Sequence, residues 1–224
     1  MKTGLKTLIV GLTVVGFANW AHAQNAALTI SDGVNPLMTF TDNGAGDLNG
    51  AMGQMFVVTN VGVWNLTITS AITKPAVGSP TSPVMDFTIQ ALSSAPGTIE
   101  YTFSDNNFLL SPGTVNAAVT GQIISGAPAT AGYTVYGDPF NIVGSETFFL
   151  ASTGTSPLPV VASNSGPLSL ATPYSLTQDV KLNASGATDI SIDASLTVVP
   201  EPGTLALVGV GVMGMVAFAR RRRS

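Results

Sequence analysis

Apolar and polar residues alternate one by one over several stretches of the chain. Ile99, Tyr101 and Phe103, for example, are separated by single polar residues. A period of two is typical of an antiparallel strand with one face in the core and the other in solvent. It predicts strands at residues 64–69, 85–91, 99–104, 176–182 and 189–198. Less regular strand candidates are Ala27–Ile30, Met38–Thr41, Met55–Asn60, Val115–Ile124 and Thr147–Ala151.

Turn-forming Gly, Pro, Ser and Asp residues separate these candidates at residues 31–33, 94–97, 111–113 and 185–186. About ten short strands with such turns, and no helical periodicity, indicate an all-β, antiparallel β-sandwich or jelly-roll-like domain. Ser152–Thr172 lacks regular alternation. We expect a long loop or an irregular strand there, with a division of the body at this point as the alternative.

The N-terminus has the features of a secretory signal helix. Two lysines precede Leu8–Ala18, an apolar run of 11 residues. A helix of that length is too short to cross a hydrocarbon core of about 30 Å, but it suits the apolar region of a signal peptide. Ala21 and Ala23 place small residues at the −3 and −1 positions, which predicts cleavage before Gln24. A plain membrane anchor is the alternative.

The C-terminus carries a second apolar segment. Thr204–Ala219 is 16 residues without a charge, and Arg220, Arg221, Arg222 and Arg223 follow directly. As a helix this segment is about 24 Å long, a short but feasible transmembrane span when the arginines reach the interface. Four adjacent arginines are expected to stay cytoplasmic, which leaves the body outside.

Pro200, Glu201 and Pro202 stand directly before this segment. The order Pro-Glu-Pro, short apolar helix and Arg cluster, over Val199–Ser224, resembles the PEP-CTERM sorting signal of Gram-negative bacteria. In that family an exosortase, a membrane cysteine transpeptidase, recognises the signal. The protein is cut near the Pro-Glu-Pro and delivered to the cell surface or extracellular matrix, typically in species that make exopolysaccharide. A tail anchor with a proline-rich stalk is the alternative.

The resemblance implies an exosortase as the processing partner, and the inner membrane as a transient partner of the C-terminal helix. With the signal at the N-terminus, it divides the chain into three parts. These are a signal peptide at 1–23, a β-sandwich extracellular domain at 24–199 and the sorting signal at 200–224.

Basic residues are scarce between the two end segments. Residues 24–199 contain only Lys74 and Lys181 against 11 acidic residues, a net charge of −9. This balance excludes the positive surface that nucleic acid or anionic lipid requires. We expect both lysines to be solvent-exposed charges that favour solubility.

The chain has no Cys, and its one His, His22, lies in the signal peptide. The body therefore has no Ser-His-Asp or Cys-His catalysis, no zinc site with His or Cys ligands and no haem ligation by His. Paired-carboxylate glycoside hydrolysis is the one enzyme class that the composition permits. Glu100 and Glu146 are the only glutamates before the tail. We predict that the protein is not an enzyme.

Asp42, Asn43, Asp47 and Asn49 place four oxygen-bearing side chains in eight residues of a Gly-rich segment. Ca²⁺ favours such oxygen ligands, so the segment is a candidate calcium site, although its spacing does not match an EF-hand loop. Asp, Asn and Gly are also ordinary turn residues, and a turn without metal is the alternative. No other cofactor is predicted.

Aromatic residues are the remaining candidates for ligand contact. Trp64 lies on the apolar face of its predicted strand, which favours a place in the core over an exposed sugar-stacking platform. Tyr133 and Tyr136, with Asp138, lie in a Gly-rich, loop-like stretch and are candidate glycan contacts.

These features predict a non-enzymatic, exported surface or extracellular-matrix protein, processed by an exosortase and associated with exopolysaccharide or biofilm. A secreted carbohydrate-binding module on the same scaffold is the alternative. A small secreted hydrolase is a third hypothesis, which requires a carboxylate pair facing a cleft.

Overall fold

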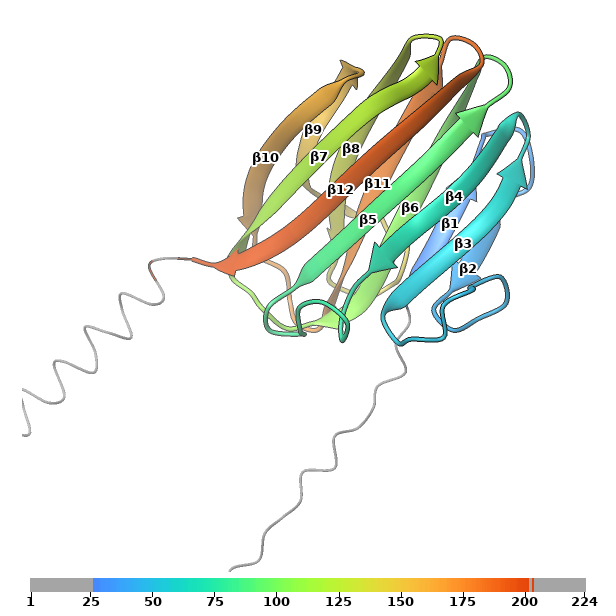
Figure 1. Cartoon of the computed structure of the whole chain (residues 1–224). Coiled ribbons are helices and arrows are strands. Elements are labelled where there is room, and N and C mark those ends of the chain that lie inside the picture. The colour runs from blue at the N-terminus through green and yellow to red at the C-terminus, as the bar shows by residue number, and fades with distance from the viewer. Residues whose placement is uncertain (1–25, 202, 204–224) are drawn as a thin grey trace, which may run out of the picture.

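The computed structural model describes residues 26–201 and 203. These residues form two six-stranded sheets in which all neighbouring strands are antiparallel (Figure 1). Sheet A has the strand order β2-β1-β6-β11-β8-β9, and sheet B has the order β10-β7-β12-β5-β4-β3. The strands are β1 (Ala27–Ser31), β2 (Met38–Thr41), β3 (Gln54–Val61), β4 (Trp64–Ile72), β5 (Val84–Ser93), β6 (Gly97–Phe108), β7 (Gly113–Gly126), β8 (Ala129–Asp138), β9 (Phe148–Pro157), β10 (Val160–Leu168), β11 (Tyr174–Ala184) and β12 (Thr188–Pro200).

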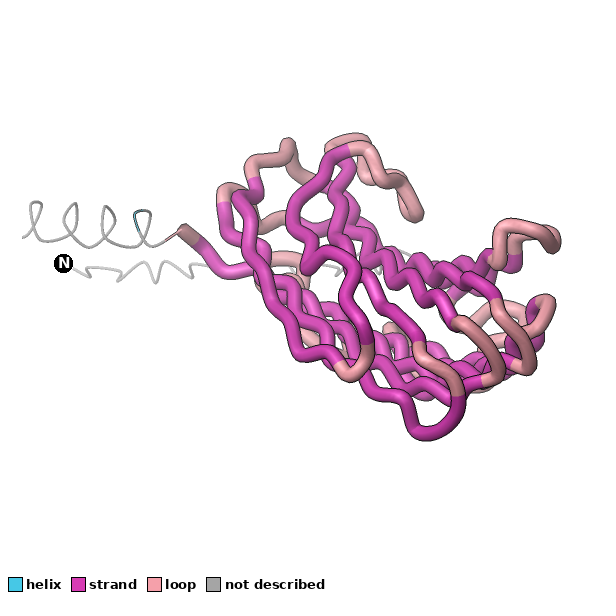
Figure 2. Tube along the Cα trace, turned by 90° about the horizontal axis from the view of Figure 1, so that it is seen from above, coloured by secondary structure: helices cyan, strands magenta, loops and turns pink. Residues whose placement is uncertain are grey.

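The predicted β-sandwich is confirmed. The five regular stretches lie within β4, β5, β6, β11 and β12, and their apolar residues are the buried ones. In Figure 1 sheet B lies in front and sheet A behind, and Figure 2 shows that the described chain consists mainly of strands joined by loops and turns.

The core lies between the two sheets and is rich in aromatic rings. The Phe87 ring from sheet B meets two rings from β6 of sheet A. It lies edge-on to Tyr101, with ring centroids 6.1 Å apart, and stacks on Phe103 at 5.8 Å. Such pairs add to the stabilisation from buried apolar area by about 0.5–1.5 kcal/mol each.

Two expectations about strands need correction: for Ser152–Thr172 the irregular-strand alternative is right and the loop alternative is wrong, and the strand count is higher than expected. Ser152–Thr172 is not a long loop, because it contains most of β9 and all of β10. β9 pairs with β8 in sheet A, and β10 pairs with β7 in sheet B. The chain thus passes from one sheet to the other at this edge, and the described residues contain twelve strands rather than about ten.

The predicted signal helix, with Ala21, Ala23 and Gln24, lies outside the described residues. So do Pro202 and the predicted transmembrane helix with its four arginines. Within the part of the chain that the structure describes, no helix is long and apolar enough to cross a membrane.

Candidate functional site

The outer face of sheet A carries a continuous row of polar side chains. The strand register places one such residue on each of the six strands, and all six are at least partly exposed to solvent. Because strand residues alternate between the two faces, the polar half of each period-two pattern collects on this face. From β2 to β9 the row consists of Thr39, Thr29, Thr102, Asp179, Thr134 and Ser152.

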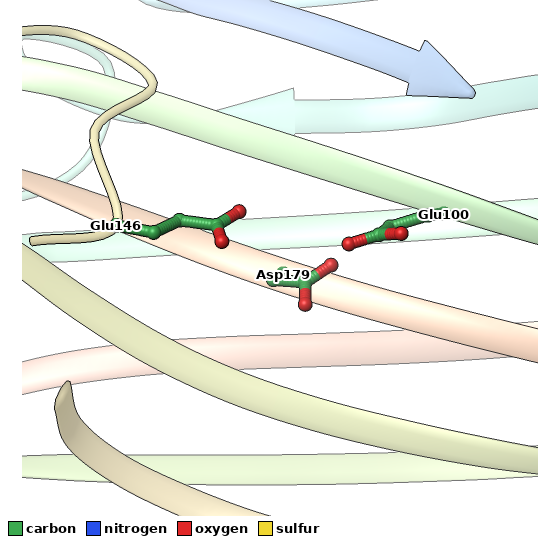
Figure 3. A group of neighbouring side chains, drawn as sticks. All are labelled: Glu100, Glu146 and Asp179. Atoms are coloured by element: carbon green, nitrogen blue, oxygen red, sulfur yellow. The ribbon is translucent and has the colours of Figure 1, made fainter. Parts of the chain in front are cut away.

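Three carboxylates converge in the middle of this face. Asp179 lies on β11, Glu100 lies on β6, and Glu146 comes from the segment between β8 and β9. One oxygen of each carboxylate lies within 4.8 Å of an oxygen of the other two. Figure 3 shows the three side chains pointing toward one another. We call Glu100, Glu146 and Asp179 the carboxylate cluster.

The cluster has little compensating charge. The Lys181 ammonium lies 3.6 Å from Glu100 Oε2 and is mostly exposed. Burial, and then the charges of Glu100 and Glu146, raise the pKa of Asp179 to about 7, against the opposing effect of Lys181. Asp179 Oδ1 is inaccessible to solvent and has no hydrogen-bond partner. Ionised Asp179 is therefore held in an environment that disfavours its charge.

Asp138, at the end of β8, organises the segment that carries Glu146. Its carboxylate accepts hydrogen bonds from the Phe140 N–H (2.6 Å), the Thr147 hydroxyl (2.8 Å) and the Ser145 hydroxyl. Burial opposes ionisation here, but these hydrogen bonds outweigh it and keep the pKa of Asp138 below its ordinary value. The residue thus closes residues 139–147 into a defined loop.

This loop is fastened to the outer face of sheet A. The Gly144 N–H donates to the Ser104 hydroxyl (2.9 Å), and the Ser175 hydroxyl donates to the Ile142 carbonyl (2.6 Å). Ser104 and Ser175 lie on β6 and β11 and are buried. The loop therefore covers one end of the polar face, which places Glu146 above the strands that carry the other two carboxylates.

Aromatic side chains border the cluster. Tyr136 on β8 is opposite Phe149 on β9, and their rings pack edge to face with centroids 6.4 Å apart. Phe149 is 65% exposed, and Phe140 in the neighbouring loop is 77% exposed. Burial, and then Glu146, Asp179 and Glu100, raise the pKa of Tyr136. The face thus combines exposed rings with hydroxyl and carboxylate groups.

The segment predicted as a calcium site is closed by its own side chains. The Asp47 carboxylate accepts hydrogen bonds from the N–H groups of Asn43 and Asn49, both at 2.9 Å. Asp42 Oδ2 accepts one from the Gly53 N–H (2.9 Å), and burial followed by the Asp47 charge raises the pKa of Asp42. These bonds are typical of turns. Calcium binding by Asp42, Asn43, Asp47 and Asn49 stays a prediction.

The structure corrects the prediction for one of the two lysines. Lys74 is buried, with Nζ 2.7 Å from Asp105 Oδ2, and it donates to the Asn106 carbonyl at 2.5 Å. The ammonium also lies 4.4 Å from the centroid of the Phe108 ring. A buried ammonium needs such partners because desolvation is costly. Lys181 is exposed, as predicted.

The aromatic candidates divide into core and surface. Trp64 is buried in the core, as predicted. The stretch around Tyr133 and Tyr136 is strand β8 and not a loop, and Tyr133 is fully buried, so its prediction as a glycan contact is wrong. Asp138 is buried as well and holds the loop. Tyr136 remains at the surface.

Sequence reasoning missed the carboxylate cluster as a unit. The sequence offers Glu100 and Glu146 only as a possible hydrolase pair, and Asp179 is a polar residue of the predicted strand 176–182. The available signal is that Glu100 and Asp179 both lie on the polar side of their strands. Their proximity depends on the register of β6 and β11, in which Asp179 pairs with Thr102 and Lys181 pairs with Glu100, and the sequence alone does not contain this register.

Comparison with known proteins identifies the C-terminal segment. Residues 198–223 match the family model of the PEP-CTERM protein-sorting motif. The chain therefore carries this motif, as the resemblance implied. No curated protein matches the chain.

Several solved structures resemble the sandwich loosely. The CBM22-1 xylan-binding domain from Paenibacillus barcinonensis Xyn10C is 14% identical, with a TM-score of 0.32 over 63% of this chain and 85% of that one. A xylan-binding domain from CBM 22 is 12% identical, with a TM-score of 0.33 over 69% and 96%. The enzymatically active domain of Bacteriophage CBA120 tailspike protein 4 is 9% identical, with a TM-score of 0.32. That match covers 62% of this chain and 20% of the tailspike chain.

Proposed function

We propose that the protein is exported, processed by an exosortase, and retained at the cell surface or in the extracellular matrix of a Gram-negative bacterium. The observation that carries this proposal is the sorting motif at residues 198–223, which begins within β12. Pro200 is the last residue of the strand, and Glu201 is exposed directly after it. The Pro-Glu-Pro thus starts where the sandwich ends.

The residues around the motif suit processing by a membrane enzyme. Proline cannot donate a backbone hydrogen bond and fixes its own φ, so Pro200 and Pro202 disfavour extension of the following helix toward the sandwich. Glu201 carries a charge that is costly to place in hydrocarbon. Cleavage there separates the sandwich from the apolar segment and the arginines, which removes its membrane attachment.

Replacement of Pro200, Glu201 and Pro202 by three alanines tests this proposal. We expect the variant to cross the inner membrane, but to remain uncut and membrane-bound. An epitope tag after Gln24 followed by cell fractionation measures this. A matched control replaces Asn35-Pro36-Leu37, an exposed tripeptide in the loop between β1 and β2, with three alanines. Normal release of the first variant at mature size would show that the motif is not the processing signal.

The exported domain acts in this proposal as a non-enzymatic binding module, with exopolysaccharide as its ligand. The supporting observation is the outer face of sheet A, where Tyr136 and Phe149 stand beside hydroxyl and carboxylate side chains. Ligand sites commonly pair aromatic surface with a few placed polar groups. The apolar face of a sugar ring packs on the aromatic side chains, and the sugar hydroxyls form hydrogen bonds with the polar groups.

Phe149→Ala tests this second part of the proposal, because the ring is exposed and its loss should leave the core intact. We expect it to weaken binding to the organism's own exopolysaccharide at least tenfold, measured by co-sedimentation. Val161→Ala is the control, since Val161 is 88% exposed on sheet B. Equal binding by both variants, or release of reducing ends from the polysaccharide, would contradict a non-enzymatic module that binds through sheet A.

A further inference from the structure

The carboxylate cluster has the dimensions of a calcium site. Ca²⁺ binds oxygens at about 2.3–2.6 Å, so two ligand oxygens of one ion lie up to about 5 Å apart. Mg²⁺ binds at about 2.0–2.1 Å, which limits that separation to about 4.2 Å. The oxygens contributed by Glu100, Glu146 and Asp179 all lie within 4.8 Å of one another. All three separations therefore fall within the span of Ca²⁺ ligands.

The charge balance of the cluster also favours a cation. Three carboxylates face one another, and the ammonium of Lys181 is the counter-charge at 3.6 Å from one of them. Asp179 gives a second, independent indication of a bound cation, because its Oδ1 is inaccessible to solvent and lacks a hydrogen-bond partner. A buried carboxylate oxygen without a donor is costly, since its hydration has been lost without replacement. The three carboxylate side chains point toward one another (Figure 3).

We propose that Glu100, Glu146 and Asp179 bind one Ca²⁺ ion on the outer face of sheet A. Three carboxylates provide up to six oxygens, within the six to eight that Ca²⁺ takes, and water supplies the rest. Glu146 is exposed, which leaves the ion a path from solvent. This site is separate from the Asp42–Asn49 segment, which lies before β3.

A bound Ca²⁺ ion would have a structural effect, because its ligands come from different elements of the fold. Glu100 and Asp179 lie on the paired central strands β6 and β11, whereas Glu146 belongs to the loop of residues 139–147. A shared ion therefore ties the loop to the sheet. Exposed carboxylate sites of extracellular modules bind Ca²⁺ with a Kd of about 10⁻⁴–10⁻³ M. We expect an affinity in this range, which external calcium is sufficient to fill.

Isothermal titration of the purified full-length chain in a non-ionic detergent tests the proposal. Calcium-free protein is titrated with CaCl₂ and, separately, with MgCl₂. We expect the carboxylate cluster to bind one Ca²⁺ per chain in the stated range, in addition to any ion at the Asp42–Asn49 segment, with Mg²⁺ bound at least tenfold more weakly. Glu146→Gln and Asp179→Asn should each weaken Ca²⁺ binding at least tenfold. Lys181→Gln should strengthen it severalfold, because it removes the competing ammonium.

Asp193→Asn is the matched control for charge, since Asp193 is an exposed carboxylate on the outer face of sheet B. It should bind Ca²⁺ as the wild type does. Thermal unfolding in EDTA verifies that Asp179→Asn is folded, and this variant should be at least as stable as the wild type because it removes an unpaired buried charge. An unchanged Ca²⁺ stoichiometry and affinity in both ligand variants, or no binding at millimolar Ca²⁺, would overturn the proposal.

Discussion

Two buried tyrosines of the core give opposite predictions for the same substitution. The Tyr133 hydroxyl donates to Gln178 Oε1 (2.6 Å) and to the Ser195 carbonyl (3.1 Å), which connects β8 of sheet A to β12 of sheet B. The Tyr101 hydroxyl is equally inaccessible but has no hydrogen-bond partner. Replacement of either residue by Phe removes the hydroxyl and leaves the ring packing in place.

The expected changes in the free energy of unfolding differ in sign. A hydrogen bond contributes about 0.5–1.5 kcal/mol net, and an unsatisfied buried polar group costs about 1–3 kcal/mol. Tyr133→Phe removes the one hydroxyl proton that Gln178 Oε1 and the Ser195 carbonyl share, so we expect a loss of about 1–3 kcal/mol. Tyr101→Phe removes an unsatisfied hydroxyl, so we expect a gain of about 1 kcal/mol or more.

Urea unfolding of residues 24–199 measures both changes. Trp64 is the only Trp in this part of the chain and is buried, so its fluorescence reports the loss of the core. Far-UV circular dichroism checks that the transition is the same by a second probe. Equal losses in the two variants would refute the reasoning. The loss of stability would then come from any change in the core and not from the hydrogen bonding of the hydroxyl.

Two further predictions concern charged side chains. Lys74→Met should destabilise the domain by about 3–5 kcal/mol in the same assay, since it removes the ammonium from buried Asp105. Lys181→Met at the exposed pair with Glu100 should cost about 1 kcal/mol or less. Similar losses in the two variants would contradict this prediction. Asp138 has a lowered folded-state pKa, so its stabilisation is present above its ordinary value of 3.8 and lost as the pH falls through the folded value. Asp138→Asn should therefore destabilise at pH 7, and progressively less as the pH falls below 3.8, in urea unfolding; a loss that does not depend on pH would argue against this role.

The regular strands were predictable because their alternation is local. Each of the five period-two stretches buries its apolar residues against one core, and this needs no knowledge of the partner strand. Most of β9 and all of β10 were not predicted as regular strands, because their alternation of apolar and polar residues is weak. β9 has register shifts where it pairs with β8, and Gly154 there has a φ of +72°. A bulge of this kind breaks the pattern without ending the strand.

Glycine misled the interpretation of β8. Gly132 and Gly137 make this stretch Gly-rich and loop-like in the sequence, but both lie within the strand. A Cβ at Gly137 would lie 2.6 Å from Leu170 Cδ1 and 3.0 Å from Leu150 Cδ1. The residue is therefore small because neighbouring side chains approach it closely, which a sequence pattern does not distinguish from a turn.

The charged groups that matter most depend on contacts between distant residues. Lys74 precedes a proline and resembles a surface charge in the sequence, yet it meets Asp105, which is 31 positions away. Glu146 is likewise brought to Asp179 by a loop that Asp138 shapes. Burial and charge pairing of this kind are properties of the assembled sheets, so neither composition nor periodicity indicates them.

The end of β12 connects the sandwich to the proposed processing step. β12 lies between β5 and β7 in sheet B, and its inward residues are buried as far as Val198. Val199 is 43% exposed, and Pro200 and Glu201 are exposed as well. A cut within Pro200–Pro202 therefore removes no core side chain, whereas a cut before Val198 would open the end of a central strand. In the proposed processing, a cut at Pro-Glu-Pro would thus leave the core and the complete outer face of sheet A in the released protein.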